Sequence, residues 1–477
     1  MHNRLIYKFV FSLAFLISII LSVEAAEVCK KVNDFSGFNE ACVSAIVTPK
    51  NTIEIINAAE IAKVRGWNIS MAGSRHSMAG QSIAPNGMYL DMRSYNKIIS
   101  FDSKTRILKV QSGATWAQIQ NYLDPKGMAI DVMQNFNIFT VGGSLSVNAI
   151  GWNTNSSTIA STVKSLLVLT SNGEVEYADR NTNSELFSLV LGGYGLFGVI
   201  LEVELLVVPN GIYKTEHQIV DYKRFPEYFN DHLVGQDSMM QAFLSLDPDS
   251  FLDKVLVLRH TRNPLEKRVP GINDVPSNKE LDNIIGDLIH VSKDNKFFRK
   301  IVWFVQKTLL PKSISLRTTR NQLMSAPLPS VLKDWTKEAL ILQTYFLPKN
   351  NFSHFVDKLR DSLNQFDVPV VSVSLIHTMK DETSFLSAMS EGDRFAVTLM
   401  FIQNRTVKAN ETMNEFSQHM IEEANNLGGS VYLAHRPSIT ESNLKDLYPL
   451  IDKFLILKKK YDPRGLFSNQ FFEKFIR

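Results

Sequence analysis

The chain has 477 residues, of which 44% are hydrophobic, 21% are charged and 10% are aromatic. This composition is typical of folded globular proteins and excludes a disordered, collagen-like or disulfide-scaffold chain. The length is sufficient for two or three domains, each with its own core. With 51 basic and 48 acidic residues the formal charge is only +3, so nothing in the overall charge indicates a nucleic-acid partner.

The first 25 residues are predicted to be a signal peptide. Arg4 and Lys8 precede a mostly apolar run from Phe9 to Val23, and small residues follow at a plausible cleavage point after Ala25. Because the run is short for a membrane span, we expect export to the periplasm or the medium, with an uncleaved anchor as the alternative.

Two cysteines, Cys29 and Cys42, follow the predicted cleavage point. In an exported chain they could form one disulfide or remain two thiols, and the sequence does not measure their separation. Since the chain has no other cysteine and no His-Glu-x-x-His spacing, no metal site is predicted.

Short helices and strands alternate between residues 45 and 209, which predicts an α+β domain over residues 26–209. Pro49 precedes an apolar repeat at helical spacing, and Asn172-Gly173 is a strong hairpin signal between two strand-like runs. The expected helices are 48–62 and 116–123, and the expected strands are 67–72, 88–90, 98–101, 107–111, 163–170, 175–178 and 199–208.

Residues 210–430 contain longer helical stretches, such as 351–365, between strands such as 370–376 and 395–402. This pattern predicts a second α+β domain, which ends at the break Leu427-Gly428-Gly429. The tail, 431–477, is too short to fold alone, so we expect it to pack on another part of the chain.

Three glycine-containing loops occur in the first domain, at residues 73–77, 140–144 and 192–198. Glycine lets backbone N–H groups turn toward an anion and approach it closely, as binding of a dinucleotide pyrophosphate requires. Gly193, Gly195 and Gly198 fit the G-x-G-x-x-G spacing, but a strand follows them instead of a helix, which excludes a Rossmann motif. Any one of these loops could also be a simple tight turn.

Five motifs follow one another over residues 45–210: SRHSMAGQS, NGMYLDMRSYNKI, TVGGSLSVNAIG, SLLVLTSNGEV and ELFSLVLGGYGLFGVILEVEL. Their order and spacing resemble the FAD domain of the vanillyl-alcohol oxidase superfamily, which has the PCMH-type fold. The tail resembles the C-termini of sugar-lactone oxidases and of decaprenylphosphoryl-ribose oxidase; it reads VYLAHRPSITESNLKDLYPLIDKFLILKKKYDPRGLFSNQFFEKF. The segment ILQTYFLP resembles a substrate-domain strand of decaprenylphosphoryl-ribose oxidase.

The resemblance implies a two-subdomain FAD-binding domain at 26–209, an α+β substrate or cap domain at 210–430, and a C-terminal segment at 431–477 that returns to the FAD domain. It also implies a FAD site. The pyrophosphate would be held mainly by backbone donors of Gly73, Ser74, Arg75, His76 and Ser77. The other implied FAD contacts are Gln81, the phosphate and ribityl loop Thr140, Val141, Gly142 and Gly143, the isoalloxazine segment Ser146, Val147, Asn148 and Ile150, the adenine-end residue Ile200, and Tyr432 from the tail.

His76 occupies the loop position at which some relatives carry a histidine bonded to the flavin 8α carbon. The resemblance therefore implies covalent FAD through His76, since a neutral imidazole can attack an activated flavin methyl group. A noncovalent histidine that hydrogen-bonds within the loop is the alternative. A second link through a cysteine is excluded, because no cysteine lies beyond Cys42.

By position, the resemblance implies five candidates on the substrate side: Gln343, Tyr345, His377, His435 and Arg436. Oxidation of a C–H bond next to oxygen needs a group that accepts the hydroxyl proton and donors that stabilise the reduced flavin. His435 stands where the ribose-oxidase relatives carry Lys, so it could be a base, an anion stabiliser or a hydrogen-bond donor. Each candidate could also be purely structural, and Arg436 could form only a surface ion pair.

Residues 291–320 contain eight Lys or Arg and one Asp, with aromatic and branched residues between the charges. This pattern fits an interfacial helix at an anionic membrane, as a peripheral contact, and it fits more simply a cap-domain helix with a solvated basic face. Pro311 is expected to end any helix there.

The sequence thus leads us to expect an exported FAD-dependent oxidase or dehydrogenase. It would oxidise a CH–OH group of a sugar, sugar lactone or polyol, transferring hydride to flavin N5, with oxygen or a quinone as electron acceptor. Two alternatives remain open: oxidation of a lipid-linked pentose as half of an epimerisation, and a flavin- or carbohydrate-binding protein without turnover.

Overall fold

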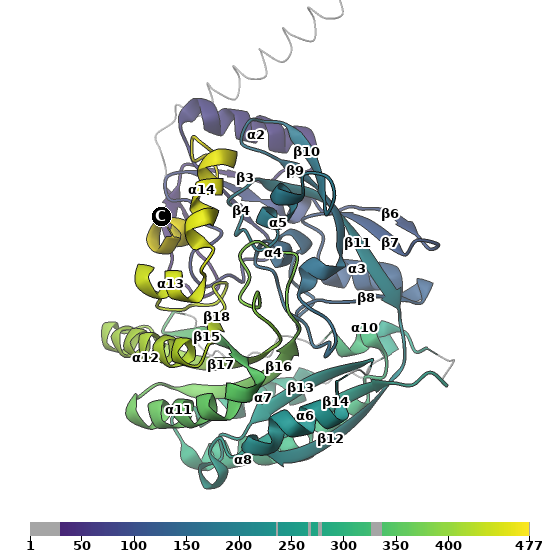
Figure 1. Ribbon diagram of the computed structural model, residues 1–477, viewed down its shortest axis with the longest axis vertical. Coiled ribbons are helices and arrows are strands. Elements are labelled where there is room, and N and C mark those ends of the chain that lie inside the picture. The colour runs from purple at the N-terminus through teal and green to yellow at the C-terminus, as the bar shows by residue number, and fades with distance from the viewer. Residues whose placement is uncertain (1–28, 235–236, 266–268, 275–278, 326–335, 477) are drawn as a thin grey trace, which may run out of the picture.

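The computed structural model describes residues 29–234, 237–265, 269–274, 279–325 and 336–476. The predicted signal peptide, 1–25, lies outside the described residues. In Figure 1 the sheets of the first domain occupy the upper half, a larger sheet occupies the lower half, and the C-terminal helices (yellow) run alongside both.

The chain begins with a hairpin and a parallel sheet. β1 (Lys30–Val32) pairs with β2 (Ala41–Val43), and a disulfide joins Cys29 to Cys42. The parallel sheet has the order β3 (Ala45–Val47), β5 (Met88–Asp91), β4 (Ile69–Ala72). Helix α2 (Thr52–Arg65) starts at an Asn51 cap and buries its alanine-rich face against this sheet.

The second subdomain is an antiparallel sheet of order β10-β9-β11-β7-β6, with β8 also paired to β11. Its strands are β6 (Ile98–Asp102), β7 (Ile107–Gln111), β8 (Met128–Ile130), β9 (Val163–Leu169), β10 (Val175–Asp179) and β11 (Val199–Pro209). Its helices are α3 (Trp116–Leu123), α4 (Val141–Ser146) and α5 (Ser184–Val190). The Asn172-Gly173 turn joins β9 to β10 as predicted.

The cap domain is built on a seven-stranded sheet of order β12-β14-β13-β16-β17-β15-β18. The strands are β12 (Tyr213–Asp221), β13 (Ser238–Leu244), β14 (Lys254–Arg262), β15 (Glu338–Pro348), β16 (Val370–Thr378), β17 (Arg394–Asn404) and β18 (Ser430–Val431). The helices are α6 (Phe225–His232), α7 (Lys279–Ser292), α8 (Lys296–Thr308), α9 (Leu310–Ser315), α10 (Arg320–Leu323), α11 (Phe352–Gln365) and α12 (Val407–Asn426).

The two faces of this sheet differ in what covers them. Alternate residues such as Tyr345, Phe395 and Leu399 pack against α6, α11 and α12, and we call this side the helix face. The other side carries Thr344, Phe346, Ser374 and Thr398, and near Phe346 it meets Ile150 and Tyr432, so we call it the domain-facing face. Successive residues of each strand point to opposite faces, which fixes this division.

The tail connects both domains. Its first strand, β18, pairs with β15 and so extends the cap sheet. α13 (Glu441–Leu447) and α14 (Ile451–Tyr461) follow. Beyond them the backbone of Ile69 in β4 exchanges hydrogen bonds with Leu466 O and Ser468 N, at 2.7 and 3.2 Å. The predicted return to the first domain therefore begins only after a segment that belongs to the cap sheet.

Most predicted elements are present with small shifts at their ends. The helix predicted at 48–62 spans 52–65, that at 116–123 has the predicted bounds, and that at 351–365 spans 352–365. α8 ends before Pro311, as expected, and Pro311 lies in the first turn of α9 (Leu310–Ser315). Among the described residues, no helix is both long and apolar enough to cross a bilayer.

Candidate functional site

The first two glycine loops lie against each other. β4 ends at Ala72, and a Cβ atom added to Gly73 would stand 1.9 Å from Oγ1 of Thr140. A Cβ atom added to Gly142 would stand 2.9 Å from Cβ of Ser112. Both positions therefore require glycine, because real Cβ contacts are never so short. The close approach makes the two loops, which are distant in sequence, parts of one site.

Arg75 is held in a left-handed backbone conformation, with φ of +62°. Its guanidinium donates to Asp91 at 3.0 Å, and Arg93 binds the same carboxylate. Burial alone would raise the pKa of Asp91, but the hydrogen bonds from Arg93 and Arg75 outweigh burial and lower the pKa. Asp91 is thus a fixed negative charge that orients the first loop.

His76 lies between two aromatic rings. Phe35 stacks on the imidazole at 4.9 Å between centroids, and Phe139 meets it edge-on at 4.4 Å. Burial lowers the pKa of His76 to about 4, against an opposing effect of the Ser74 backbone, so the ring is neutral at pH 7. Its buried Nδ1 atom makes no hydrogen bond of normal geometry with the described residues.

The segment from Ser146 to Ile150 is fixed from three sides. Ser146 donates to Gly142 O at 2.8 Å, and Tyr432 donates through its hydroxyl to Val147 O at 2.9 Å. Asn148, with φ of +50°, donates to the Asp381 carboxylate at 2.7 Å. The tail and the cap domain therefore both contact the segment to which the resemblance assigns the isoalloxazine.

The polar groups of these loops fit a bound FAD. Arg75 Nε, Ser112 Oγ and Asn148 Oδ1 are buried and have no hydrogen-bond partner among the described residues. Such groups are costly unless a ligand or water satisfies them. Arg75 lies on the first loop, Ser112 lies against Gly142 of the second, and Asn148 follows α4, so the three groups are spread as an extended polar ligand requires.

The remaining predicted FAD contacts have diverse surroundings. The Ser74 hydroxyl donates to Ile138 O, Ser77 meets Ser82, and Gln81 donates to Leu433 O of the tail at 2.7 Å. The side chains of Val141 and Ile200 are buried in the hydrophobic core, so only their backbone could meet a ligand. Gly143 donates its N–H to the Thr140 hydroxyl.

On the substrate side, His435 belongs to a chain of hydroxyl groups. Its Nδ1 lies 2.9 Å from Oγ1 of Thr344, which lies 2.7 Å from Oγ1 of Thr398. Burial lowers the pKa of His435 to about 3, so the ring is neutral at pH 7. Its ring also meets Tyr432 edge-on at 5.0 Å, which connects this chain to the isoalloxazine segment.

The structure corrects the placement of Gln343 and Tyr345. Both point to the helix face of β15, where the Tyr345 hydroxyl donates to Gln343 at 2.8 Å and the ring packs on Phe355. His435 contacts Thr344, on the opposite face of the strand. Gln343 and Tyr345 therefore do not converge with His435, because neighbouring strand residues alternate between faces.

The side chains of His377 and Arg436 also make their contacts with groups other than His435. His377 packs against Phe229 and Phe395 on the helix face, with Nδ1 2.8 Å from Thr154 O. Arg436 lies over the ring of Phe38, at 4.0 Å, and donates to Asn410 at 2.6 Å. Burial lowers the pKa of Arg436 to about 10, which leaves it charged at pH 7.

Sequence reasoning missed Thr344, Thr398 and Phe35. Thr344 lies between the two predicted candidates Gln343 and Tyr345, so the sequence identified the correct strand but not the face of it that contacts His435. β15 is buried on both faces and reads as a nearly continuous apolar run, which hides its orientation. Phe35 had no signal at all, because its contact with His76 joins segments that only the tertiary structure brings together.

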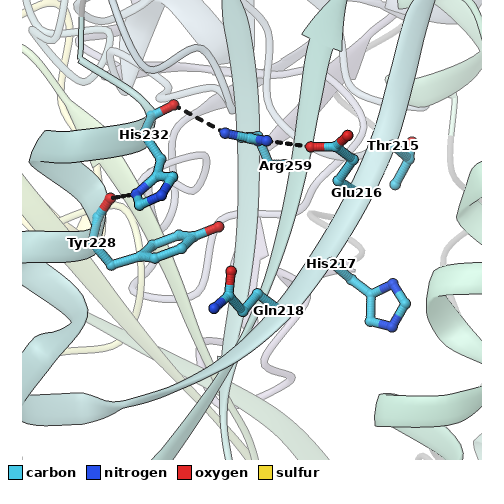
Figure 2. A pocket seen from close by; sticks show the side chains of 7 residues that line it. All are labelled: Thr215, Glu216, His217, Gln218, Tyr228, His232 and Arg259. Atoms are coloured by element: carbon cyan, nitrogen blue, oxygen red, sulfur yellow. Dashed lines mark hydrogen bonds and ion pairs between the residues drawn. The ribbon is translucent and has the colours of Figure 1, made fainter.

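A separate hollow of about 430 Å³ lies at the β12 edge of the cap sheet. Figure 2 shows Arg259 between Glu216 and the carbonyl of His232, with Tyr228 below. None of the predicted site residues lines this hollow.

Two family models match the chain: FAD binding domain over residues 43–179, and D-arabinono-1,4-lactone oxidase over residues 329–475. Decaprenylphosphoryl-beta-D-ribose oxidase of Mycolicibacterium smegmatis is 23% identical over 449 residues, which cover 90% of this chain and 93% of that protein. L-gulonolactone oxidase of Bos taurus is 20% identical over 454 residues, covering 91% and 95%.

A shorter match is an uncharacterized oxidoreductase from the fasciation locus of Rhodococcoides fascians, 29% identical over 224 residues. The alignment covers 46% of this chain and only 50% of that protein. The solved structure of a solvent-stable cholesterol oxidase is similar with a TM-score of 0.73 and 16% identity, over 93% of this chain and 97% of that chain. This similarity shows a common fold.

Proposed function

We propose that this chain oxidises a CH–OH group of a sugar, sugar lactone or polyol. The basis is its family: it belongs to the FAD-dependent oxidoreductases that join a PCMH-type FAD-binding domain to a D-arabinono-1,4-lactone oxidase domain. The bound FAD supplies the hydride acceptor. The observation that carries the proposal is that the tail contacts both domains at one place. Tyr432 of the tail bonds to Val147 of the FAD domain, and His435 of the tail bonds to Thr344 of the cap sheet.

In this proposal His435 orients the substrate hydroxyl as a neutral group. Because burial lowers the pKa of His435 to about 3, the ring is neutral at pH 7 and does not act as a cationic anion stabiliser. Because Thr344 holds Nδ1, the other ring nitrogen, Nε2, is the atom available to a substrate hydroxyl. Thr344 fixes the ring orientation, and Thr398 fixes Thr344.

The partly exposed side chains of the domain-facing face support a polyhydroxylated substrate. Ser374 and Thr398 present hydroxyls there beside Thr344, and Phe243, which pairs with Ser374 and packs toward Trp303 of α8, adds apolar surface. Hydroxyl groups and apolar contacts suit a neutral sugar-like molecule, which has both C–H surfaces and hydroxyls to satisfy.

The test is anaerobic mixing of the purified flavoprotein with a panel of aldoses, alditols and aldonolactones. We expect one class to bleach the flavin absorbance, and admitting air or adding a quinone then identifies the electron acceptor. His435→Ala should slow bleaching while retaining the flavin. A FAD-loaded protein that no member of the panel bleaches would overturn the proposed substrate class.

Two further features complete the proposal. The neutral, buried His76 suits a covalent bond to the flavin, since only an unprotonated imidazole nitrogen is nucleophilic. Export is supported by the Cys29–Cys42 disulfide, because disulfides persist mainly in oxidising compartments.

A further inference from the structure

Helices α8 and α9 expose an unusual set of large apolar side chains. The exposed fractions are 65% for Phe297, 58% for Phe304, 46% for Leu309 and 57% for Leu316. Phe297 and Phe304 are seven residues apart and so lie on the same face of α8. Two neighbouring phenylalanines that are each more than half exposed are not explained by a merely solvated face.

The core does not require this arrangement. The inner face of α8 packs Val302 and Trp303, and Trp303 meets Leu256 and Leu258 of the cap sheet. The helix is therefore already anchored by its buried side, and α7, which packs on α8, also exposes Ile284 and Val291.

The charged residues within the segment that carries these side chains are all basic. The segment 296–316 contains Lys296, Arg299, Lys300, Lys307 and Lys312 and no acidic residue. Within the part of the chain that the structure describes, Lys296, Lys307 and Lys312 form no ion pair, whereas Lys300 pairs with the exposed Asp249. Acidic groups near the patch include Asp247 and Asp249 beside Lys300, Asp287 on α7 and the exposed Asp294 before α8.

The structure also reduces the basic excess that the sequence indicates. Arg320 is buried and donates to Ile130 O, and Lys293 pairs with Glu338. The Arg299 guanidinium donates hydrogen bonds to the backbone oxygens of Ser292 and Lys293. The cations that remain at the surface are the lysines that alternate with the exposed apolar side chains.

We propose that the outer face of α8 and α9, formed by Phe297, Phe304, Leu309 and Leu316 with Lys296, Lys300, Lys307 and Lys312, binds the surface of an anionic membrane. Aromatic and aliphatic side chains enter the boundary between headgroups and acyl chains, and lysines attract anionic headgroups. α8 lies at the lower end of the molecule, opposite α2 (Figure 1), so binding there leaves the FAD domain clear of the bilayer.

The test is co-sedimentation of the full chain with vesicles of phosphatidylcholine alone or mixed equally with phosphatidylglycerol. We expect binding to the anionic vesicles, reduced by salt. F297S/F304S should lower the partition coefficient about tenfold, and K307E/K312E should remove the preference for anionic vesicles. All variants share the N-terminus of the unchanged protein, so an N-terminal contribution is common to them.

The matched controls are I53S/V64S, which replaces two side chains exposed on α2, and K97E/K104E on the FAD domain. Both should bind as the unchanged chain does. Flavin content and turnover should be the same in every variant, so a failure of the proposed catalytic function would not affect this result. Equal binding by F297S/F304S and I53S/V64S, or no binding by the unchanged chain, would overturn the proposal.

Discussion

At the scale of single residues, the site depends on hydrogen bonds that hold neutral side chains in one orientation. His435 and His76 are both uncharged at pH 7 because burial disfavours their imidazolium forms. One is fixed by the Thr344 hydroxyl and the other by two aromatic rings. Their neighbours should therefore affect the chemistry as much as the histidines themselves.

Thr344→Val removes the hydroxyl with little change of volume, and Nδ1 of His435 loses its partner. We expect flavin reduction by substrate to slow about tenfold, as for the loss of about 1.4 kcal/mol, with flavin content unchanged. Stopped-flow absorbance measures the rate. Thr344→Ser, which keeps a hydroxyl, should reduce the flavin at the rate of the unchanged protein. Tyr345→Phe, on the opposite face, should also leave this rate unchanged; a slower rate in Tyr345→Phe would place Tyr345 back in the site.

His76→Ala should abolish flavin that remains attached after acid precipitation. The reason is that the variant lacks the imidazole nitrogen that we propose bonds to the flavin methyl group. Absorbance of the precipitated protein is the measurement, with Ser74→Ala as a control in the same loop that should retain bound flavin. If acid releases all the flavin from the unchanged protein, the covalent bond does not exist.

At the scale of elements, the disulfide-closed N-terminal loop joins parts that are distant in sequence. Phe35 N donates to Ser77 O at 3.1 Å, and Gly80 N donates to Asp34 at 2.9 Å. From the cap domain, Arg405 donates to Ser36 O at 3.0 Å. The disulfide-closed loop thus lies between the first glycine loop and the cap domain, although it belongs to neither sheet core.

We expect the double variant Cys29→Ser, Cys42→Ser to lose about 3 kcal/mol of unfolding free energy, because an open loop gains conformational entropy in the unfolded chain. Denaturant unfolding with and without a reducing agent measures this loss. The reductant should destabilise the unchanged protein by the same amount and leave the double variant unaffected. If the reducing agent also destabilises the double variant, its effect on the unchanged protein has a cause other than the Cys29–Cys42 disulfide.

At the scale of the whole molecule, two buried histidines lie where the domains meet. His260 in β14 stacks on Trp152 at 6.4 Å, and His377 in β16 contacts Thr154 O. Burial lowers the pKa of His260 to about 3 and that of His377 to about 4. Part of the contact between the FAD and cap domains is therefore made by side chains that burial keeps neutral.

Acid should consequently weaken this protein. The unfolded histidines bind protons below a pH of about 6.5, whereas the folded ones do not until pH 3 to 4, so stability is lost as the pH falls through this window. His260 alone accounts for about 2 kcal/mol at pH 5. His260→Asn should flatten the fall of the melting temperature between pH 7 and 5, and His217→Asn, an exposed histidine, should not.

The sequence alone determined the positions of the glycine loops and most helices and strands of the first domain. These features arise from local patterns, namely glycines at turns, alternation in strands and caps at helix ends, which neighbouring residues specify. The order of the motifs also indicated the cap domain and the returning tail.

Only the tertiary structure decided which residues face one another across the site. The side of β15 that meets the FAD domain could not be read from ILQTYFLP, since a shift of one residue exchanges Thr344 for Gln343 or Tyr345 and both faces are buried. The same holds for Phe35 on His76 and for the tail strand that joins the cap sheet. Contacts between distant segments depend on how whole sheets pack, which no local pattern encodes.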